Sequence, residues 1–415
     1  MSQPLDSIAA GLIPSPDVAP PVAAASGRDV HEPALDNDRG TSHETTAPVD
    51  CVRTLHVING EDYSGAERVQ DLLALRLPEF GYEVGFACVK PDRFAQACEA
   101  QSVPLYEAPM RAKFDLRPAW TLARLIRRDQ YRLVHTHSPR AALVGSLAAR
   151  LARVPFVHHV HGQTAVGTVP RWHKWINTVT ERASLAGVAA VIAVSDSAAR
   201  YLKEQGIPED KIRRVPNGVP SPPQLPFRPE PHGTWTLGTA AMFRPRKGAE
   251  VLLDAVALLR DQGHRVRLRM VGRFQFPWYE KQIRERTSRQ NLDALVDWVG
   301  FTGDVNVELA RMDVFILPSV LAEGLPMAVI EAMAAGVPVI GTRVPGTLDT
   351  VRHGEDGLLV EPGDAEALAS AVAGLIEGRW NWSALRQRAY RQQVARFSDR
   401  SMAAGVAEIY RRILT

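Results

Sequence analysis

The segment from Asp313 to Pro338 limits the fold most strongly, because it reads as a buried strand, a turn and a short helix. Asp313–Leu317 is an apolar run of the kind that parallel strands show when both faces are covered. Pro326 suits the first helical position, and Gly336 suits the left-handed residue just past the helix end. A strand that enters a helix in this way predicts an open α/β sheet, whose ligands bind at the carboxyl edge of the strands.

Glu323 and Glu331 lie eight positions apart and bracket the start of this helix. The free N–H groups and the positive dipole end of a helix start suit a phosphate, which a carboxylate would repel. We therefore interpret both carboxylates as acceptors for hydroxyl groups, and a sugar nucleotide carries phosphates and hydroxyls together. The alternative is an ordinary amphipathic helix with one capping acid and one solvated acid.

Length and composition exclude several classes of protein. A chain of 415 residues is too long for one hydrophobic core, since such cores stop growing at about 250–300 residues. Its hydrophobic content of 45% and charged content of 23% are typical of a soluble globular protein. The longest apolar or glycine run, 185–194, is too short for a spanning helix, which needs about 18 residues. The net charge of +3 does not support nucleic-acid binding.

The compartment is indicated by the cysteines and by the start of the chain. Cys51, Cys88 and Cys98 have neither paired nor metal-like spacing, which favours a reducing cytoplasm. The chain begins without a basic stretch followed by an apolar one, so secretion by a signal peptide is not expected.

Composition and periodicity divide the chain into five parts. Residues 1–50 are expected to be disordered, because this low-complexity tail cannot bury enough apolar surface to offset its ordering entropy. Seven prolines between 216 and 233 cannot continue a helix or a central strand, so this segment is the predicted linker. The parts are therefore the tail at 1–50, a first Rossmann-like domain at 51–215, the linker at 216–233, a second Rossmann-like domain at 234–398 and a final helix at 399–415.

Strand and helix patterns alternate on both sides of the linker, which predicts an α/β fold with two doubly wound parallel sheets. The two domains are expected to face each other across a cleft. Helices are expected at 66–80, 249–262 and 400–414. Strands are expected at 52–58, 82–89, 131–137, 155–160 and 188–194 in the first domain, and at 235–241, 266–271, 295–301, 313–317 and 337–340 in the second.

The string Pro-Ser…Glu-Gly-Leu-Pro…Glu-Ala-Met-Ala…Gly-Val-Pro-Val-Ile at 318–340 strongly resembles the retaining GT-B glycosyltransferases of family 4. The resemblance covers about 52–414, and its motifs are more specific in the second domain than in the first. It implies a nucleotide diphosphate sugar as the donor substrate, with neither a cofactor nor a metal. By family habit, it also implies a glycan or a lipid-linked glycan as the acceptor and a place in cell-surface polysaccharide or glycolipid synthesis. The last helix crosses back to the first domain in that family.

The turn Phe243–Gly248 follows an expected strand and carries Arg244, Arg246 and Lys247. Cations at such a turn suit a diphosphate and the charge that develops on a leaving group, whereas a solvated basic turn is the alternative. The family usually has an arginine five residues before the lysine, and Met242 stands there in this chain. The resemblance therefore assigns a catalytic role to Lys247, and Arg244 or Arg246 would supply the missing guanidinium.

The resemblance also assigns roles around the acidic turn. Glu323 would hold hydroxyls of the donor sugar, and Glu331 would accept the ribose hydroxyls of the nucleotide. The N–H groups around Gly324 and Leu325 would meet phosphate oxygens. Gly272, in a Gly-Arg dipeptide after a strand, resembles the nucleotide-side loop of the family.

Two residues of the first domain resemble family positions near the reacting groups. Gly65, in Ser-Gly-Ala-Glu, resembles the loop near the donor phosphates and the acceptor, where a glycine permits close backbone approach. A simple helix-entry glycine is the alternative. His161 sits at the carboxyl end of its strand, where catalytic groups collect, and the family has a histidine near the reacting carbon at this place.

Histidines raise a competing interpretation. His135 and His137 share a strand face, as do His159 and His161, because side chains alternate with period two. A metal site built from such pairs is conceivable. Since no carboxylate or cysteine accompanies them at ligand spacing, no metal is expected.

The segment 171–182 combines cations with Trp172 and Trp175. An amphipathic basic helix of this kind could rest on a membrane, which would place the protein at the inner face of the membrane. The alternative is a surface helix whose tryptophans pack inward. A liposome flotation assay with substitutions of the two tryptophans would separate these interpretations.

The sequence thus predicts a cytoplasmic, metal-independent, retaining glycosyltransferase of the hexosyltransferase type. A nucleotide-sugar epimerase on the same two-domain plan is one rival, and a non-catalytic nucleotide-sugar binder is another. A Rossmann dehydrogenase is disfavoured, because no Gly-x-Gly-x-x-Gly follows the first strand.

Overall fold

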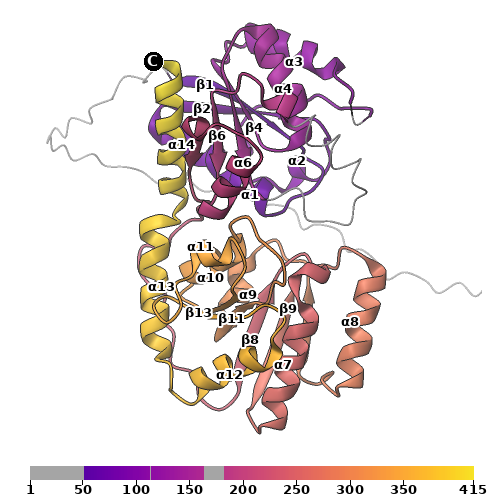
Figure 1. The fold of residues 1–415 in the computed structure, drawn as a ribbon, viewed down its shortest axis with the longest axis vertical. Helices are drawn as coiled ribbons and strands as arrows, with labels where there is room; N and C mark the ends of the chain where they lie inside the picture. Colours follow the sequence, from indigo (N-terminus) through magenta and orange to yellow (C-terminus); the bar gives the residue numbers. More distant parts are fainter. Residues whose placement is uncertain (1–50, 113, 163–181) are drawn as a thin grey trace, which may run out of the picture. The chain divides into compact units, whose positions relative to one another are not determined.

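The computed structural model describes residues 51–112, 114–162 and 182–415, all of which belong to one compact unit, Pro48–Thr415. The tail at 1–50 and the segment with Trp172 and Trp175, with the structures expected for them, lie outside the described residues. The described chain forms two parallel sheets with helices packed around them (Figure 1). No described helix combines the length and the apolar character that crossing a bilayer requires.

The first sheet has seven strands in the order β3-β2-β1-β4-β5-β6-β7. The order reverses between β1 and β4, and such a switch point leaves room for a ligand beyond the carboxyl ends of the strands. The strands are β1 (Val52–Ile58), β2 (Tyr82–Cys88), β3 (Leu105–Glu107), β4 (Leu133–Thr136), β5 (Phe156–Val160), β6 (Ala190–Ala193) and β7 (Ile212–Arg214).

In the first domain, the sequence supplies a clear cap for the start of α4. Ser138 is the N-cap of α4, where its hydroxyl accepts the N–H of Ala141 at 3.1 Å and Pro139 takes the first helical position. The helical segments are α1 (Gly65–Arg76), η1 (Leu77–Phe80), α2 (Phe94–Ala97), α3 (Arg117–Arg128), α4 (Pro139–Ala152), α6 (Asp196–Glu204) and η2 (Glu209–Lys211).

The second sheet has six strands in the order β10-β9-β8-β11-β12-β13, and its switch point lies between β8 and β11. The loops after these two strands are those that sequence analysis singled out. The strands are β8 (Trp235–Ala240), β9 (Val266–Val271), β10 (Val296–Gly300), β11 (Val314–Leu317), β12 (Val339–Thr342) and β13 (Leu358–Val360). The helices are η3 (Pro245–Lys247), α7 (Ala249–Asp261), α8 (Pro277–Arg289), α9 (Val305–Leu309), α10 (Met327–Ala334), α11 (Thr347–Thr350), α12 (Ala365–Ile376) and α13 (Trp382–Arg396).

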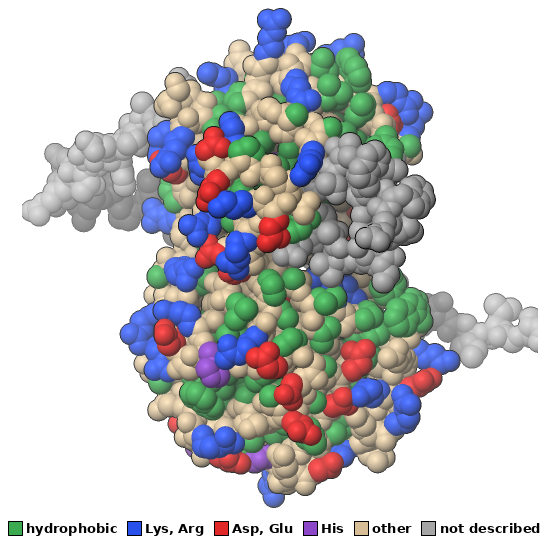
Figure 2. Space-filling model, in the orientation of Figure 1, with side chains coloured by type: hydrophobic (Ala, Val, Ile, Leu, Met, Phe, Trp, Pro, Cys, Tyr) green, Lys and Arg blue, Asp and Glu red, His purple; other side chains and the backbone are tan. Residues whose placement is uncertain are grey.

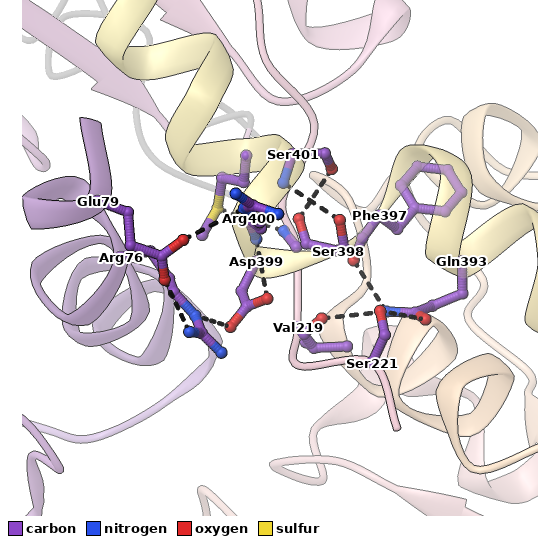
Figure 3. A network of polar contacts seen from close by, with 12 residues as sticks. Arg76, Glu79, Val219, Ser221, Gln393, Phe397, Ser398, Asp399, Arg400 and Ser401 are labelled. Atoms are coloured by element: carbon purple, nitrogen blue, oxygen red, sulfur yellow. Dashed lines mark hydrogen bonds and ion pairs between the residues drawn. The ribbon is translucent and has the colours of Figure 1, made fainter. Parts of the chain in front are cut away.

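The chain crosses from one domain to the other twice, and the two crossing segments are hydrogen-bonded to each other (Figure 3). The N–H of Val219 donates to the carbonyl of Phe397 at 2.9 Å, and the N–H of Asp399 donates back to the carbonyl of Val219 at 3.0 Å. Gln393 donates its side-chain N–H to the same carbonyl at 3.0 Å. Asp399 also accepts from Arg76 of α1 at 2.6 Å, which ties the start of α14 (Asp399–Leu414) to the first domain.

Helix α14 packs its apolar face onto the first domain, along which it runs in Figure 1. Met402, Val406, Ile409 and Tyr410 belong to the hydrophobic cluster of that domain. The same cluster takes in Leu325 and residues of α10 from the second domain. The residue limits of the two domains stay a prediction, because these contacts connect the domains and mark no boundary between them.

The expected elements agree with the structure in most places. β1 and β9 have the predicted bounds, and the other predicted strands are present with ends shifted by one or two residues. The predicted place of Pro326 is wrong by one position: α10 begins at Met327, and Pro326 is its N-cap, whose carbonyl accepts the N–H of Val329 at 3.1 Å. Gly336 has the predicted left-handed conformation, with φ +64°. Sequence analysis missed β3, β7 and β13, each a three-residue edge strand.

Charged side chains of both signs are interspersed on the face drawn in Figure 2. This mixture accords with the net charge of +3. A protein that binds nucleic acid through its backbone phosphates instead gathers basic side chains into a patch or a stripe. The expectation that the chain binds no nucleic acid stays a prediction.

Candidate active site

The loops at the carboxyl edge of the second sheet are bonded to one another. Val320, after β11, donates its N–H to the carbonyl of Arg246 at 2.9 Å, and this bond joins the acidic turn to the basic turn. Glu323 donates its N–H to the carbonyl of Pro345, after β12, at 2.9 Å. Backbone hydrogen bonds alone therefore hold the two turns against each other at the switch point.

Glu323 is the centre of a cluster of charged side chains. Its Oε1 accepts from Nζ of Lys247 at 2.7 Å and from the hydroxyl of Ser319 at 2.6 Å, and its Oε2 lies 3.4 Å from Nη2 of Arg246. The residue is only 6% exposed. Burial raises the pKa of Glu323, but Lys247 and Arg246 together outweigh it, so the net shift is downward. The carboxylate is therefore ionised at neutral pH.

The two arginines of the basic turn differ in what they contact. Arg246 has partners for its N–H groups, because it donates to the carbonyl of Ala322 at 2.7 Å and to Glu323. Arg244 is partly buried, and its Nε has no hydrogen-bond partner among the described residues. A buried donor without a partner is costly, and an oxygen of a ligand would satisfy it. Arg244 is thus the better candidate to replace the guanidinium that Met242 lacks.

Glu331, on α10, faces a cation of the first domain. Its Oε1 lies 3.2 Å from Nε of Arg68 on α1. This N–H is not aligned to donate, since it has no hydrogen-bond partner among the described residues. Burial raises the pKa of Glu331, and Arg68 only partly opposes this shift. Sequence analysis missed Arg68, because nothing in the α1 pattern distinguishes it from a solvated arginine.

Backbone contacts bring the predicted residues of the first domain to the acidic turn. A Cβ on Gly324 would overlap the carbonyl oxygen of His161, so only a glycine permits this approach. Gly65, the first residue of α1, lies against α10, since a Cβ there would sit 3.1 Å from Cγ of Met327. Gly324 and Leu325 donate their N–H groups to no group within the described part of the chain. These free donors suit a phosphate oxygen.

Gly272 is placed beside the basic turn. Its φ of +125° and the carbonyl of Ala241, which a Cβ would overlap, both require glycine. Next to it, Arg273 accepts the N–H of Phe243 at 2.8 Å, which joins the loop after β9 to the basic turn. Arg273 also forms an ion pair of 2.7 Å with Asp62, in the loop after β1.

Five histidines line one face of the first sheet. His56 lies in β1, His135 in β4 and His159 in β5, while His137 and His161 directly follow β4 and β5. The shared faces that period two predicts are confirmed by stacked or tilted rings, with centroids 4.1 Å apart for the first pair and 4.4 Å for the second. His56 lies opposite His135 in the β1–β4 register. Burial lowers the pKa of His161 to about 3, so this ring is neutral at pH 7.

Two triads of these rings have ligand atoms within 4.8 Å of one another: His56, His135 and His137, and His137, His159 and His161. Neutral imidazoles at such distances have the chemistry to hold a zinc ion. Hydrogen bonds between the rings already explain much of the short spacing between these nitrogens. His137 lies 3.1 Å from His161 and 3.2 Å from His56, measured between ring nitrogens.

Gly248 provides a test of how the basic turn is built. Its φ is +66°, and a Cβ there would overlap the carbonyl oxygen of Pro318 at the end of β11. Gly263, after the other end of α7, also has a positive φ of +85° but has open space around it. We expect Gly263→Ala to lower the free energy of unfolding by about 1 kcal/mol and Gly248→Ala by roughly 3 kcal/mol, measured by urea denaturation. Equal effects would contradict the close approach of the two turns.

Comparison with known proteins identifies the family. A family model described as Glycosyltransferase Family 4 matches residues 63–221, and one described as Glycosyl transferases group 1 matches residues 235–378. The first match takes in β2 to β7 of the first sheet but not β1, and the second match takes in all strands of the second sheet. The chain belongs to the retaining GT-B glycosyltransferases of family 4, as the acidic turn and the basic turn indicated.

Individual relatives show the same relationship. The chain is 28% identical over 346 residues to the phosphatidyl-myo-inositol mannosyltransferase of Mycobacterium leprae, a match over 78% of this chain and 85% of that protein. It is 33% identical over 200 residues to the putative colanic acid biosynthesis glycosyltransferase WcaL of Escherichia coli, over 45% of this chain and 47% of that one. The crystal structure of Anabaena Alr3699/HepE in complex with UDP has the same fold, with a TM-score of 0.76 and 20% identity over 87% of this chain and all of the other.

Proposed function

We propose that this glycosyltransferase moves a sugar from a nucleotide diphosphate sugar to an acceptor hydroxyl with retention, during synthesis of a cell-surface polysaccharide or glycolipid. The family supports the type of reaction. The named relatives act on phosphatidyl-myo-inositol or in colanic acid biosynthesis, which supports a glycan or a lipid-linked glycan as the acceptor. Alr3699/HepE has also been crystallised with UDP-glucose, so uridine diphosphate sugars are the first donors to test.

The observation that carries this proposal is the bond of 2.7 Å between Lys247 and Glu323 at the switch point. A partly buried cation and a buried carboxylate, from the turns after β8 and β11, meet where a bound sugar diphosphate would need both. The cation suits the diphosphate, and the carboxylate suits sugar hydroxyls. Arg244, with its unused Nε, adds a second donor for phosphate oxygens.

In the proposed reaction, the bond between the anomeric carbon and the diphosphate oxygen breaks, and its electron pair stays on the departing phosphate. The acceptor oxygen forms the new bond on the same face of the sugar, and its proton passes to the departing phosphate. No enzyme nucleophile is needed on this route. Lys247, Arg244 and the free N–H groups of Gly324 and Leu325 would lower the barrier by stabilising the negative charge on the leaving group.

Other residues would hold the rest of the donor. Glu331 would accept hydrogen bonds from the ribose hydroxyls. These hydroxyls would replace the N–H of Arg68, whose Nε lies 3.2 Å from Oε1 of Glu331 but is poorly aligned. Gly272 would lie beside the nucleotide, and Gly65 would let the start of α1 approach the donor phosphates. His161, whose carbonyl touches Gly324, would lie near the reacting carbon.

Metal independence and location are part of the proposal. Lys247 and the two arginines of the basic turn would neutralise the diphosphate in place of a metal, which supports catalysis without one. We propose that the enzyme works in the cytoplasm, with peripheral association at the inner face of the membrane if its acceptor is lipid-linked.

The proposal is tested first by thermal shift with nucleoside diphosphates and their sugar conjugates. One of them should raise the melting temperature, and the matching sugar nucleotide should support transfer to a glycan or lipid-linked acceptor. Transfer should persist in the presence of a chelator, and its loss there would contradict metal independence alone. Binding without transfer or hydrolysis would favour the non-catalytic binder. Conversion of the donor to its epimer without any acceptor would favour the epimerase.

A further inference from the structure

A line of hydrogen bonds runs from the core of the first domain to the candidate active site. The hydroxyl of Tyr410, on α14, lies 2.5 Å from Nδ1 of His135 and 3.0 Å from Nε2 of His56. Nδ1 of His56 lies 3.2 Å from Nε2 of His137, whose Nδ1 lies 3.1 Å from Nε2 of His161. These five residues are called the histidine line. Its two outermost nitrogens, Nε2 of His135 and Nδ1 of His161, have no partner among the described residues.

All five members of the histidine line are neutral near pH 7. Burial lowers the pKa of His56 and of His161 to about 3, and it lowers the pKa of His135 and His137 well below the usual range. Burial likewise raises the pKa of the Tyr410 hydroxyl well above its usual value. Each member therefore carries one polar hydrogen, on one of two nitrogens in each ring or on the phenol oxygen.

The count of hydrogens leaves one to spare. Five members have five hydrogens, and the four contacts between them use four. Because every contact needs one donor and one acceptor, three arrangements are possible: the bonds all run in one direction, they all run in the other, or the Tyr410 oxygen accepts from both of its neighbours. The spare hydrogen then lies on Nδ1 of His161, on Nε2 of His135 or on the hydroxyl of Tyr410.

The two ends differ in their surroundings. His135 and Tyr410 are both fully buried, so a spare hydrogen on either of them would be an orphan donor in the protein core. His161 is partly exposed as a residue, and its carbonyl touches Gly324 of the proposed donor site, although its Nδ1 is itself buried and unpaired. A ligand bound at that site is the group that can satisfy a donor at this end of the line. The spare hydrogen is therefore more stable on His161.

We propose that the histidine line fixes the proton of His161 on Nδ1, so that this ring acts at the site as a hydrogen-bond donor and not as a base. This inference rests on the proposed function, which it deepens. A neutral N–H donor can bind a sugar hydroxyl or a phosphate oxygen, but it cannot take the proton of the acceptor. That proton must then go to the departing phosphate. His56, His137 and Tyr410 are positioning residues, because they act through His161.

The tautomer of His161 is measurable without activity. In the full chain labelled with ¹⁵N-histidine, the nitrogen shifts show which ring nitrogen carries the proton, and the spectrum of His161→Ala assigns the signals. We expect the Nδ1–H tautomer in the wild type, although a neutral imidazole in water prefers Nε2–H. A wild-type spectrum with Nε2–H would overturn the inference.

Breaking the line should release this tautomer. In His137→Phe the Nε2 of His161 loses its partner, so we expect a shift toward Nε2–H. We also expect kcat to fall in proportion to the remaining fraction of Nδ1–H, with little change in the donor KM. His137→Gln, whose amide N–H can donate to Nε2, should restore Nδ1–H in part. An unchanged tautomer in folded His137→Phe would contradict the inference.

His159→Phe is the matched control. The His159 ring stacks on His161 at 4.4 Å, but both of its nitrogens lack hydrogen-bond partners among the described residues. A phenyl ring keeps this stacking and removes two unsatisfied atoms, so tautomer and transfer should stay unchanged. Stoichiometric zinc binding that His159→Phe abolishes would overturn the inference, because the ring nitrogens would then be metal ligands. If no donor supports transfer, the proposed function fails, whereas the wild-type spectrum still decides where the proton lies.

Discussion

Replacing Glu323 with alanine is expected to lower the rate of sugar transfer by on the order of 100-fold or more, equivalent to about 2.7 kcal/mol of transition-state stabilisation. The variant loses the proposed acceptor for the hydroxyls of the donor sugar. It also leaves the partly buried Lys247 without the carboxylate that now lies 2.7 Å away. Steady-state transfer assays with saturating acceptor measure the effect, reported as kcat/KM for the donor.

The control for this variant is another buried glutamate of the same domain. Glu308 is also 6% exposed, and it is paired with Arg269 and Arg311 instead of the basic turn. Glu308→Ala should lower the melting temperature, because it removes the ion-pair partner of Arg311 and one of the two partners of Arg269, while the folded enzyme keeps its turnover. Near wild-type turnover in Glu323→Ala would remove Glu323 from the site. Equal loss in both variants would show that the effect comes from stability.

The fold could be predicted from sequence wherever a local pattern is complete. β1 and β9 are apolar runs bounded by turn residues, and both have their predicted bounds. The edge strands β3 and β7 have three residues each, too few to show a period, and short edge strands are common because long ones invite association. Pro326 was misplaced by one position, because proline is compatible both with an N-cap and with the first helical residue.

The site was predictable as a set of residues but not as a set of contacts. The resemblance pointed to Lys247 and Glu323, yet their bond joins positions 76 residues apart and depends on β8 lying next to β11. The histidines of β4 and β5 were visible through period two. Tyr410 was visible only as part of an amphipathic helix, because its bond to His56 spans 354 residues. Contacts of this kind depend on the sheet order and on the return of α14, which no local pattern contains.

Lys247→Met is expected to lower transfer by roughly 100- to 1000-fold, the range observed when a fixed donor to developing negative charge is removed. Lys247 is partly buried beside Glu323, and it lies in the turn that would face the diphosphate. Lys247→Arg keeps the cation at the same position and should therefore lose less activity. If the two variants lose the same activity, charge at this position is not what lowers the barrier. Turnover of Lys247→Met close to that of the wild type would remove Lys247 from the mechanism.

The same variant should change the pH dependence of the enzyme. Burial alone would raise the pKa of Glu323, and the wild type holds it below the usual value because Lys247 and Arg246, with the hydrogen bond from Ser319, outweigh burial. Without Lys247 that pKa must rise, so the acid limb of the activity profile should move to higher pH. A carboxyl with a lowered pKa stabilises the fold above its unfolded pKa and loses this contribution as the pH falls through its folded pKa. Thermal unfolding from pH 7 to pH 4 should therefore show a smaller loss of stability in Lys247→Met than in the wild type. Parallel curves of stability against pH for the two proteins would show that Lys247 does not control the ionisation of Glu323.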